Sequence, residues 1–445
     1  MNLRRIIMEK LFNLKERGTT VSKEIVGGIT TFLAMAYILA VNPNILSESG
    51  MNWASVFTAT AVSAGIATLV MAFIANLPIA LAPGLGLNAF FTYTVVFQMG
   101  ASWQIALTAV LLEGILFIVL SLLGVREAII KSIPANLKKA VAVGIGLFIT
   151  IIGLANNAGV ASTETGTFIG FVNLNMQSPA ALVAIIGLII TIVLYVLKVP
   201  GSVLIGIIAT TIIGIPFGVT TIPEGWTPFS TPAAPHLFAF NFHEIAAFGI
   251  GKFIVIFITF LFTDMFDTIG TLMGVAEQGD LKDSDGNIKN AKGALLSDAV
   301  GTVVGACLGT STVTSFVESS SGVAAGARTG LSSLVTGLLF LVALFLWPLF
   351  SIIPSAATAP ALIFVGFLMM KSVTGIDFAD PTEGIPAFIT IMVMPFAYSI
   401  SKGISWGMIA YVIAKVAGKK AKDIPVVTWI LAAVFLADII FEAVK

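Results

Sequence analysis

The sequence of 445 residues is poor in charge, in cysteine and in histidine. Only 10% of the residues are charged, whereas an ordinary soluble domain carries roughly 25%. Hydrophobic residues make up 57%, so the surface of the folded chain must itself be apolar and must face lipid. The single cysteine, Cys307, excludes a disulfide framework within the chain. The formal net charge of zero gives no indication of a nucleic-acid partner.

Catalytic and metal-binding motifs are also missing from the sequence. The two histidines, His236 and His243, fall in one loop, and no HExxH, CxxC, P-loop or G-x-S-x-G motif is present. Residues 283–287, "DSDGN", begin like a calcium loop, but Ile288 replaces the required glycine and Ala294 replaces the required glutamate. The sequence therefore predicts a protein that is not an enzyme and that binds neither a metal nor a cofactor.

Long apolar runs are abundant. A helix that crosses a membrane needs about 20 predominantly apolar residues. The predicted spans number fourteen, and they are 24–41, 53–75, 83–98, 103–123, 138–156, 179–197, 201–218, 248–274, 294–308, 313–327, 330–350, 357–372, 384–400 and 402–417. A further run, 425–441, is expected to form an interfacial or partly inserted helix. The predicted fold class is an all-α polytopic membrane protein.

The distribution of lysine and arginine predicts the orientation, because cytoplasmic loops carry an excess of positive charge. Basic residues precede the first span and follow even-numbered spans, whereas the loop 219–247 contains none. These basic residues are Arg4, Arg5, Lys10, Lys15, Arg17, Lys23, Arg126, Lys131, Lys138, Lys139, Lys198, Lys282, Lys289, Lys292, Lys419, Lys420 and Lys422. We therefore expect a multi-pass protein of the cytoplasmic membrane, with a cytoplasmic amino terminus and with 219–247 outside.

Two of the predicted spans are poor membrane helices. The third, "NLPIALAPGLGLNAFFTYTVV", contains two prolines and two glycines in residues 78–86, and the tenth, "GTSTVTSFVESSSGVAAGARTG", is rich in Ser, Thr and Gly. We expect an extended piece before a short helix in each. Such breaks are tolerated at membrane depth only where protein or a water-filled cavity satisfies the backbone. Breaks at matching positions of two halves indicate a transporter binding site, and two halves of seven spans are expected to be inverted.

Carboxylates within the spans indicate where that site lies. An ionised carboxylate at the bilayer centre costs at least ~2.5–3.5 kcal/mol, so these residues face the protein interior and usually mark a pathway or a site. Asp264 and Asp267 lie in "FITFLFTDMFDTIGTLMG", where their i, i+3 spacing places both on one helix face. Glu318 lies at the break of the tenth span, where Ser, Thr and backbone donors are expected to hold its carboxylate.

Three other polar residues within the predicted spans have two interpretations each. Glu113 and Asp298 stand alone in their spans, and a structural and a functional role are equally open for both. Asn88 lies just inside the short helix of the third span, so it is a candidate for ligand contact, with a helix cap as the alternative.

Four stretches resemble a known transporter family. They are "GGITTFLAMAYILAVNP", "APGLGLNAFF", "FTDMFDTIGTLMG" and "GTSTVTSFVESSSGVAAGARTG". In this order, and over nearly the whole chain, they resemble the AzgA-like purine permeases of the nucleobase–cation symporter-2 group. The resemblance implies proton-coupled uptake of adenine, guanine or hypoxanthine. It also implies a fold of seven plus seven inverted spans. The histidine that follows the span 8 acid in the uracil branch is missing, which argues against a uracil carrier.

The resemblance implies a core domain and a gate domain, each built from both halves of the chain. The implied segments are 1–23 (cytoplasmic amino-terminal segment), 24–123 (core, spans 1–4), 124–247 (gate, spans 5–7, with the external loop), 248–350 (core, spans 8–11) and 351–445 (gate, spans 12–14, with the carboxy-terminal helix).

The family's functional residues match four positions of this sequence. Asn88, Asp264 and Glu318 match its substrate-binding residues, and Asp267 matches the residue implicated in proton coupling. The chemistry agrees, because a carboxylate accepts two adjacent N–H groups of a neutral purine side by side, and a Phe can cover the ring face. The expected partners are a purine base and the lipid bilayer, and a homodimer stays open.

Two other classes of protein remain as alternatives. An anion transporter or channel on the same fold would need cationic or helix-dipole sites at the breaks, which the three acids disfavour. An intramembrane enzyme or a receptor is disfavoured because no catalytic constellation is present.

Overall fold

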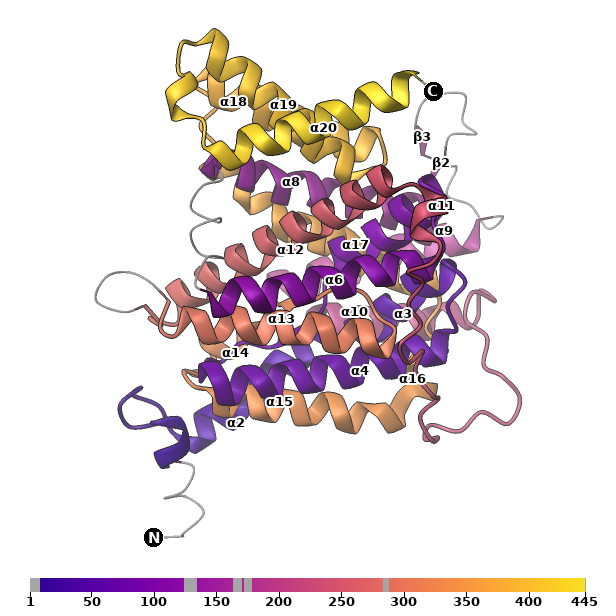
Figure 1. Ribbon diagram of the computed structural model, residues 1–445. Helices are drawn as coiled ribbons and strands as arrows, with labels where there is room; N and C mark the ends of the chain where they lie inside the picture. Colours follow the sequence, from indigo (N-terminus) through magenta and orange to yellow (C-terminus); the bar gives the residue numbers. More distant parts are fainter. Residues whose placement is uncertain (1–8, 124–133, 163–169, 172–177, 283–287, 445) are drawn as a thin grey trace.

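The computed structural model describes residues 9–123, 134–162, 170–171, 178–282 and 288–444. Arg4, Arg5, Arg126, Lys131 and the 283–287 turn of the sequence analysis lie outside these residues. The described chain is a bundle of helices with two short pairs of strands (Figure 1).

The elements of the first half begin with α2 (Val21–Met35) and end with α10. After α2 they are α3 (Ile38–Glu48), α4 (Trp53–Val70), η1 (Met71–Ala75), β1 (Leu81–Pro83), α5 (Leu85–Ala89), η2 (Phe90–Gln98), α6 (Trp103–Leu122), α8 (Ala135–Ile152), η3 (Gly153–Asn157), β2 (Ala161–Ser162), β3 (Gly170–Phe171), α9 (Pro179–Val196) and α10 (Ser202–Gly214). The elements of the second half are α11 (Ile245–Phe248), α12 (Ile250–Gln278), α13 (Ala291–Leu308), β4 (Val313–Ser315), α14 (Ser319–Ala324), α15 (Gly330–Ala343), η5 (Leu344–Leu346), α16 (Trp347–Ser351), α17 (Ser355–Met370), η6 (Lys371–Gly375), α18 (Pro381–Phe396), α19 (Ile400–Ala417), η7 (Ala421–Asp423) and α20 (Val426–Val444).

The predicted class, an all-helical multi-pass membrane protein, is confirmed. Nine helical segments of the described chain are long and apolar enough to cross a membrane. The other predicted spans fall on shorter, broken or less apolar elements, namely β1–α5–η2, α10, β4–α14, α18 and α19. The run that was expected to be interfacial forms α20.

We expected the first span to be one helix, but the structure divides it into two, α2 and α3. α2 ends at Met35 and α3 begins at Ile38, and a tight turn joins them in which the Leu39 N–H donates a 3.1 Å hydrogen bond to the Ala36 carbonyl. Pro43 lies inside α3 and has no N–H for the carbonyl four residues earlier, which weakens the helix close to this turn. The turn places Tyr37 inside the protein, where it is 1% exposed.

The two broken spans meet through their extended pieces, and this confirms the prediction that an extended piece precedes a short helix. β1 and β4 pair antiparallel, with Ala82 opposite Thr314. Hydroxyl side chains satisfy backbone groups beside this pair: Thr68 accepts from the Leu81 N–H at 2.9 Å, and Ser319 accepts from the Ala80 N–H at 3.0 Å. Internal pairing of this kind is what allows irregular backbone within a membrane protein.

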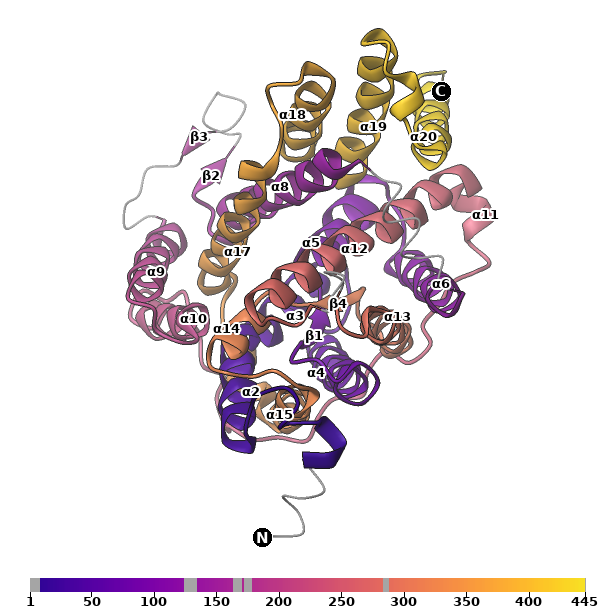
Figure 2. The same cartoon turned by 90° about the vertical axis from the view of Figure 1, so that its left-hand side faces the viewer.

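The helices form two groups that are visible in an end-on view (Figure 2). In one group, α13 packs against α4 and α6, α15 packs against α2 and α4, and the β1–β4 pair lies among these helices. In the other group, α8 packs against α17 and α18, α18 packs against α19, and α9 packs against α10 and α17. Both groups contain elements from both halves of the chain.

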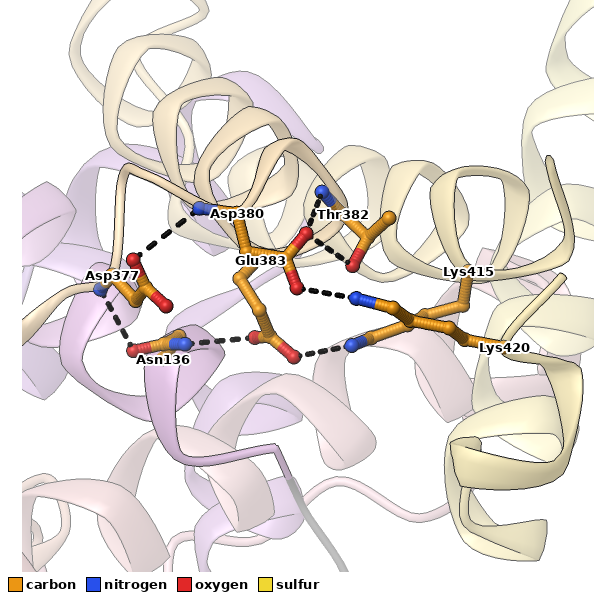
Figure 3. A network of polar contacts seen from close by, with 7 residues as sticks. All are labelled: Asn136, Asp377, Asp380, Thr382, Glu383, Lys415 and Lys420. Carbon is orange, nitrogen blue, oxygen red and sulfur yellow. Dashed lines mark hydrogen bonds and ion pairs between the residues drawn. The ribbon is translucent and has the colours of Figure 1, made fainter. Parts of the chain in front are cut away.

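A polar network joins α8, α18 and α19 at one end of the second group (Figure 3). The Lys415 ammonium lies 2.6 Å from a Glu383 carboxylate oxygen, and the Asn136 amide donates to the other Glu383 oxygen at 2.9 Å. Nearby, the Lys420 ammonium donates a 2.6 Å hydrogen bond to Asp380, which caps α18. This donor lowers the pKa of the Asp380 carboxyl well below its usual range. The Lys415–Glu383 pair is largely buried, with side-chain exposures of 6% and 18%.

Candidate substrate-binding site

A cavity of about 70 Å³ lies beside the β1–β4 pair. Its polar lining consists of Tyr37, Thr263, Asp267, Thr271, Ser315 and Glu318. Its apolar lining includes two residues of α8 and two of α17, namely Ile145, Ile149, Val365 and Met369. Ligand pockets usually measure roughly 300–1,000 Å³, so this cavity is small for a ligand.

Glu318 lies at the start of α14 and lines this cavity. The Tyr37 hydroxyl donates a 2.5 Å hydrogen bond to one of its carboxylate oxygens. Our expectation named Ser, Thr and backbone donors: a backbone hydrogen bond from Glu318 itself is present, whereas the hydroxyl of Tyr37 was not expected. A hydroxyl of the break, that of Ser319, instead accepts a hydrogen bond from the N–H of Ala80, the residue before β1.

Asp264 and Asp267 lie on the same helix, α12, but have different surroundings. Asp267 lines the cavity, close to the backbone of Gly84: a methyl group added to that glycine would lie 3.7 Å from an Asp267 oxygen. Asp264 is fully buried and is not among the residues that line the cavity. Its carboxylate instead accepts a 3.3 Å hydrogen bond from Thr268.

Thr268 connects Asp264 to a second carboxylate. The Thr268 hydroxyl lies 2.9 Å and 3.0 Å from the two oxygens of Asp298 on α13, and 2.8 Å from the Thr314 hydroxyl on β4. All four residues are buried. Asp298, for which two roles were open, thus joins α12, α13 and the strand pair behind the cavity.

Asn88 and Glu113 both bind to the segment that leads into β4. Asn88 on α5 is fully buried, and its side-chain oxygen accepts a hydrogen bond from the Ser311 hydroxyl. The Asn88 amide nitrogen has no hydrogen-bond partner among the described residues. Glu113 on α6 accepts a 2.9 Å hydrogen bond from the Thr312 hydroxyl. Neither residue is among those that line the cavity.

Sequence reasoning missed two residues of this site. Tyr37 and Thr268 touch predicted site acids, and both were overlooked. For Tyr37 a signal existed, because it is one of only five tyrosines in the chain and lies in an otherwise apolar run. The phenylalanine that lines the cavity is Phe316, whereas Phe257, a residue of α12 near the acids, lines an open apolar groove between α6 and α12.

The cavity has a chemistry that suits a small neutral solute. Carboxylates lie on its polar side and accept hydrogen bonds, whereas the aliphatic side chains of α8 and α17 have no polar group for a ligand. Such a site, at broken segments and between two groups of helices, is typical of a membrane carrier.

Comparison with known proteins identifies the family of carriers to which this chain belongs. The model of the Permease family matches residues 22–406, and the chain belongs to this family. This confirms the resemblance noted in the sequence and the expectation that the chain is a transporter rather than an enzyme.

Two curated relatives and one solved structure show how far the similarity extends. The guanine/hypoxanthine permease PbuG of Bacillus subtilis (strain 168) is 44% identical over 443 residues, which cover 98% of this chain and 100% of that relative. The adenine permease AdeP of Escherichia coli (strain K12) is 40% identical over 437 residues, which cover 98% and 96%. The transmembrane domain of the cyanobacterium bicarbonate transporter BicA superposes with a TM-score of 0.62 at 19% identity, covering 88% of this chain and 97% of that domain, and this likeness concerns the fold alone.

Proposed function

We propose that this protein carries purine bases (guanine, hypoxanthine or adenine) into the cell by alternating access, with protons as the coupling ion. The observation that carries the proposal is the position of Glu318: its carboxylate faces a cavity between the strand pair and an apolar wall. Relatives named guanine/hypoxanthine permease and adenine permease, which are similar over the full length, support the choice of solute.

The base is bound by its polar edges and covered on its faces. Glu318 and Asp264 accept hydrogen bonds from ring N–H and exocyclic amine groups. Asn88 supplies its amide N–H, which has no partner among the described residues. The aliphatic side chains of α8 and α17 cover the ring.

Asp267 is the proposed proton-coupling residue. It lies three residues from Asp264, so its protonation state and the bound ligand influence each other. Because Asp267 itself lines the cavity, the competing assignment gives it the contact with the base and gives the proton to Asp264.

The movement is a displacement of two domains. We propose fourteen spans in two inverted halves of seven, with a core domain (24–123 and 248–350) and a gate domain (124–247 and 351–445). The two helix groups and the fold shared with BicA support this division. The amino terminus is cytoplasmic in this proposal. Alternating access follows if the core, which carries the acids, moves against α8 and α17.

Uptake measurements test this function. In cells without their own purine carriers, expression of the protein should drive accumulation of radiolabelled purine. Excess purine should compete, and uracil and sulfate should not. Accumulation should collapse with a protonophore and should not require sodium. Competition by sulfate would instead favour an anion transporter on the same fold, and dependence on sodium alone would refute proton coupling.

Two matched variants separate the roles of the aspartates. Asp267→Asn should bind purine but fail to accumulate it against a gradient, and Asp264→Asn should lose binding. The reverse result would support the competing assignment.

A further inference from the structure

Tyr37 and Glu318 form a contact at the proposed site that joins residues 281 positions apart in the chain. Tyr37 lies in the turn between α2 and α3, is 1% exposed, and donates a 2.5 Å hydrogen bond to one oxygen of Glu318. Both side chains line the cavity. The turn therefore brings a hydroxyl group directly to the carboxylate of the site.

One hydrogen bond to the Glu318 carboxylate comes from its own backbone. Rotation about the last side-chain bond of a glutamate is soft, so the plane of the carboxylate needs an external anchor. Glu318 occupies the position before α14 but makes no side-chain cap to that helix. The hydroxyl of Tyr37 is the anchor that the structure shows, and it leaves the second carboxylate oxygen free of this contact.

We infer that Tyr37 is a positioning residue of the binding site. Its hydroxyl holds the Glu318 carboxylate in the plane that a flat heterocycle with adjacent N–H donors requires. This inference rests on the proposed purine transport. Tyr37 acts through Glu318: a carboxylate fixed before the ligand arrives loses less freedom on binding. A ligand that uses two parallel N–H bonds depends more on this orientation than a ligand that uses one.

Two purines differ in the groups that would meet this carboxylate. Guanine has an N1–H next to an exocyclic amine, whereas hypoxanthine has the N1–H without that amine. Removal of the Tyr37 hydroxyl should therefore weaken the binding of guanine more than the binding of hypoxanthine. A purely structural tyrosine would alter stability and would leave the ratio of the two affinities unchanged.

The chain contains a matched control for this contact. Tyr93 is also buried, at 2% exposure, and its hydroxyl donates to Glu48 at 3.1 Å. Neither of these two residues is among those that line the cavity. Tyr93→Phe thus removes a hydrogen bond between a buried tyrosine and an exposed glutamate, away from the proposed site.

The experiment measures guanine and hypoxanthine binding to the purified full-length protein by calorimetry, together with melting temperatures. Tyr37→Phe should weaken the binding of guanine about tenfold, which is close to the contribution of one hydrogen bond to a charged group, and the binding of hypoxanthine about threefold. Tyr93→Phe should bind both purines as the wild type does. Equal affinities for Tyr37→Phe and wild type, or an equal loss in both variants, would overturn the inference. A wild-type protein that binds neither purine would overturn the proposed function itself.

A second comparison tests the same contact from the side of Glu318. In Glu318→Gln, Tyr37 should hold the amide oxygen and leave the NH₂ group facing the ligand. The double variant Tyr37→Phe/Glu318→Gln lets the amide rotate and present its oxygen instead. It should regain measurable guanine binding, which Glu318→Gln alone should lack, and the absence of any such gain contradicts the positioning role.

Discussion

Replacement of Glu318 by glutamine tests the proposed site most directly. Glutamine has nearly the same shape, so the packing at the start of α14 should survive. The hydrogen bond from Tyr37 can also persist, because an amide oxygen accepts from a hydroxyl as a carboxylate oxygen does. The change therefore lies at the other position, where an acceptor becomes an NH₂ donor.

The expected loss of affinity follows from two contributions. A hydrogen bond to a charged group contributes about 1.5–3 kcal/mol, and this bond to the purine is lost. The ligand donor is then buried against another donor, and an unsatisfied buried polar group costs about 1–3 kcal/mol. Together these contributions predict weaker binding by about two to four orders of magnitude, enough to abolish a measurable signal for a micromolar ligand.

Calorimetric or thermal-shift titration with guanine, hypoxanthine and adenine measures this effect. The melting temperature of the ligand-free variant serves as the control for folding. If Glu318→Gln melts like the wild type and binds a purine with unchanged affinity, Glu318 is a structural acid and the proposed site is wrong. A smaller loss is expected for Asn88→Ala, where a water molecule can take the place of the amide.

Three other perturbations test the architecture around the site. Lys415→Met leaves the largely buried Glu383 carboxylate without its cation, which should cost about 3–5 kcal/mol of stability. Lys420→Met, at a 42% exposed position, should change the melting temperature little, and equal shifts in the two variants would refute the distinction. Gly86→Ala places a methyl group 2.6 Å from a side chain of α8, so it should slow uptake. Gly274→Ala, whose methyl group meets no atom within 4 Å, should not slow uptake. Normal uptake by Gly86→Ala would show that the two helix groups have more freedom there. Burial lowers the pKa of His236 from 6.5, and its Nε2 accepts a 3.2 Å hydrogen bond from a backbone N–H. Because the unfolded chain takes up the proton more readily, the stability that neutral His236 contributes is complete above pH 6.5 and declines at lower pH. The melting-temperature advantage of the wild type over His236→Phe should therefore shrink between about pH 7.5 and pH 5, and a constant difference would contradict this assignment.

The sequence alone determined the environment of this protein and the location of its irregular backbone. With 57% hydrophobic and 10% charged residues, no arrangement of the chain can present a polar surface to water. Proline and glycine in residues 78–86, and Ser and Thr in residues 309–321, disfavour helix through local backbone geometry and hydrogen bonding, so the two breaks were predictable. The orientation of Asp264, Asp267 and Glu318 towards the protein interior was also predictable, because lipid excludes charged groups.

Only the tertiary structure decided which partner each of these groups has. Helical spacing placed Asp264 and Asp267 on one face, but packing sends one towards Thr268 and the other towards the cavity. The pairing of β1 with β4 and the contact of Tyr37 with Glu318 join segments more than 200 positions apart. A local sequence determines backbone preference and the direction of a side chain relative to its own helix. The neighbour that it meets depends on how distant helices pack, and no local pattern encodes that.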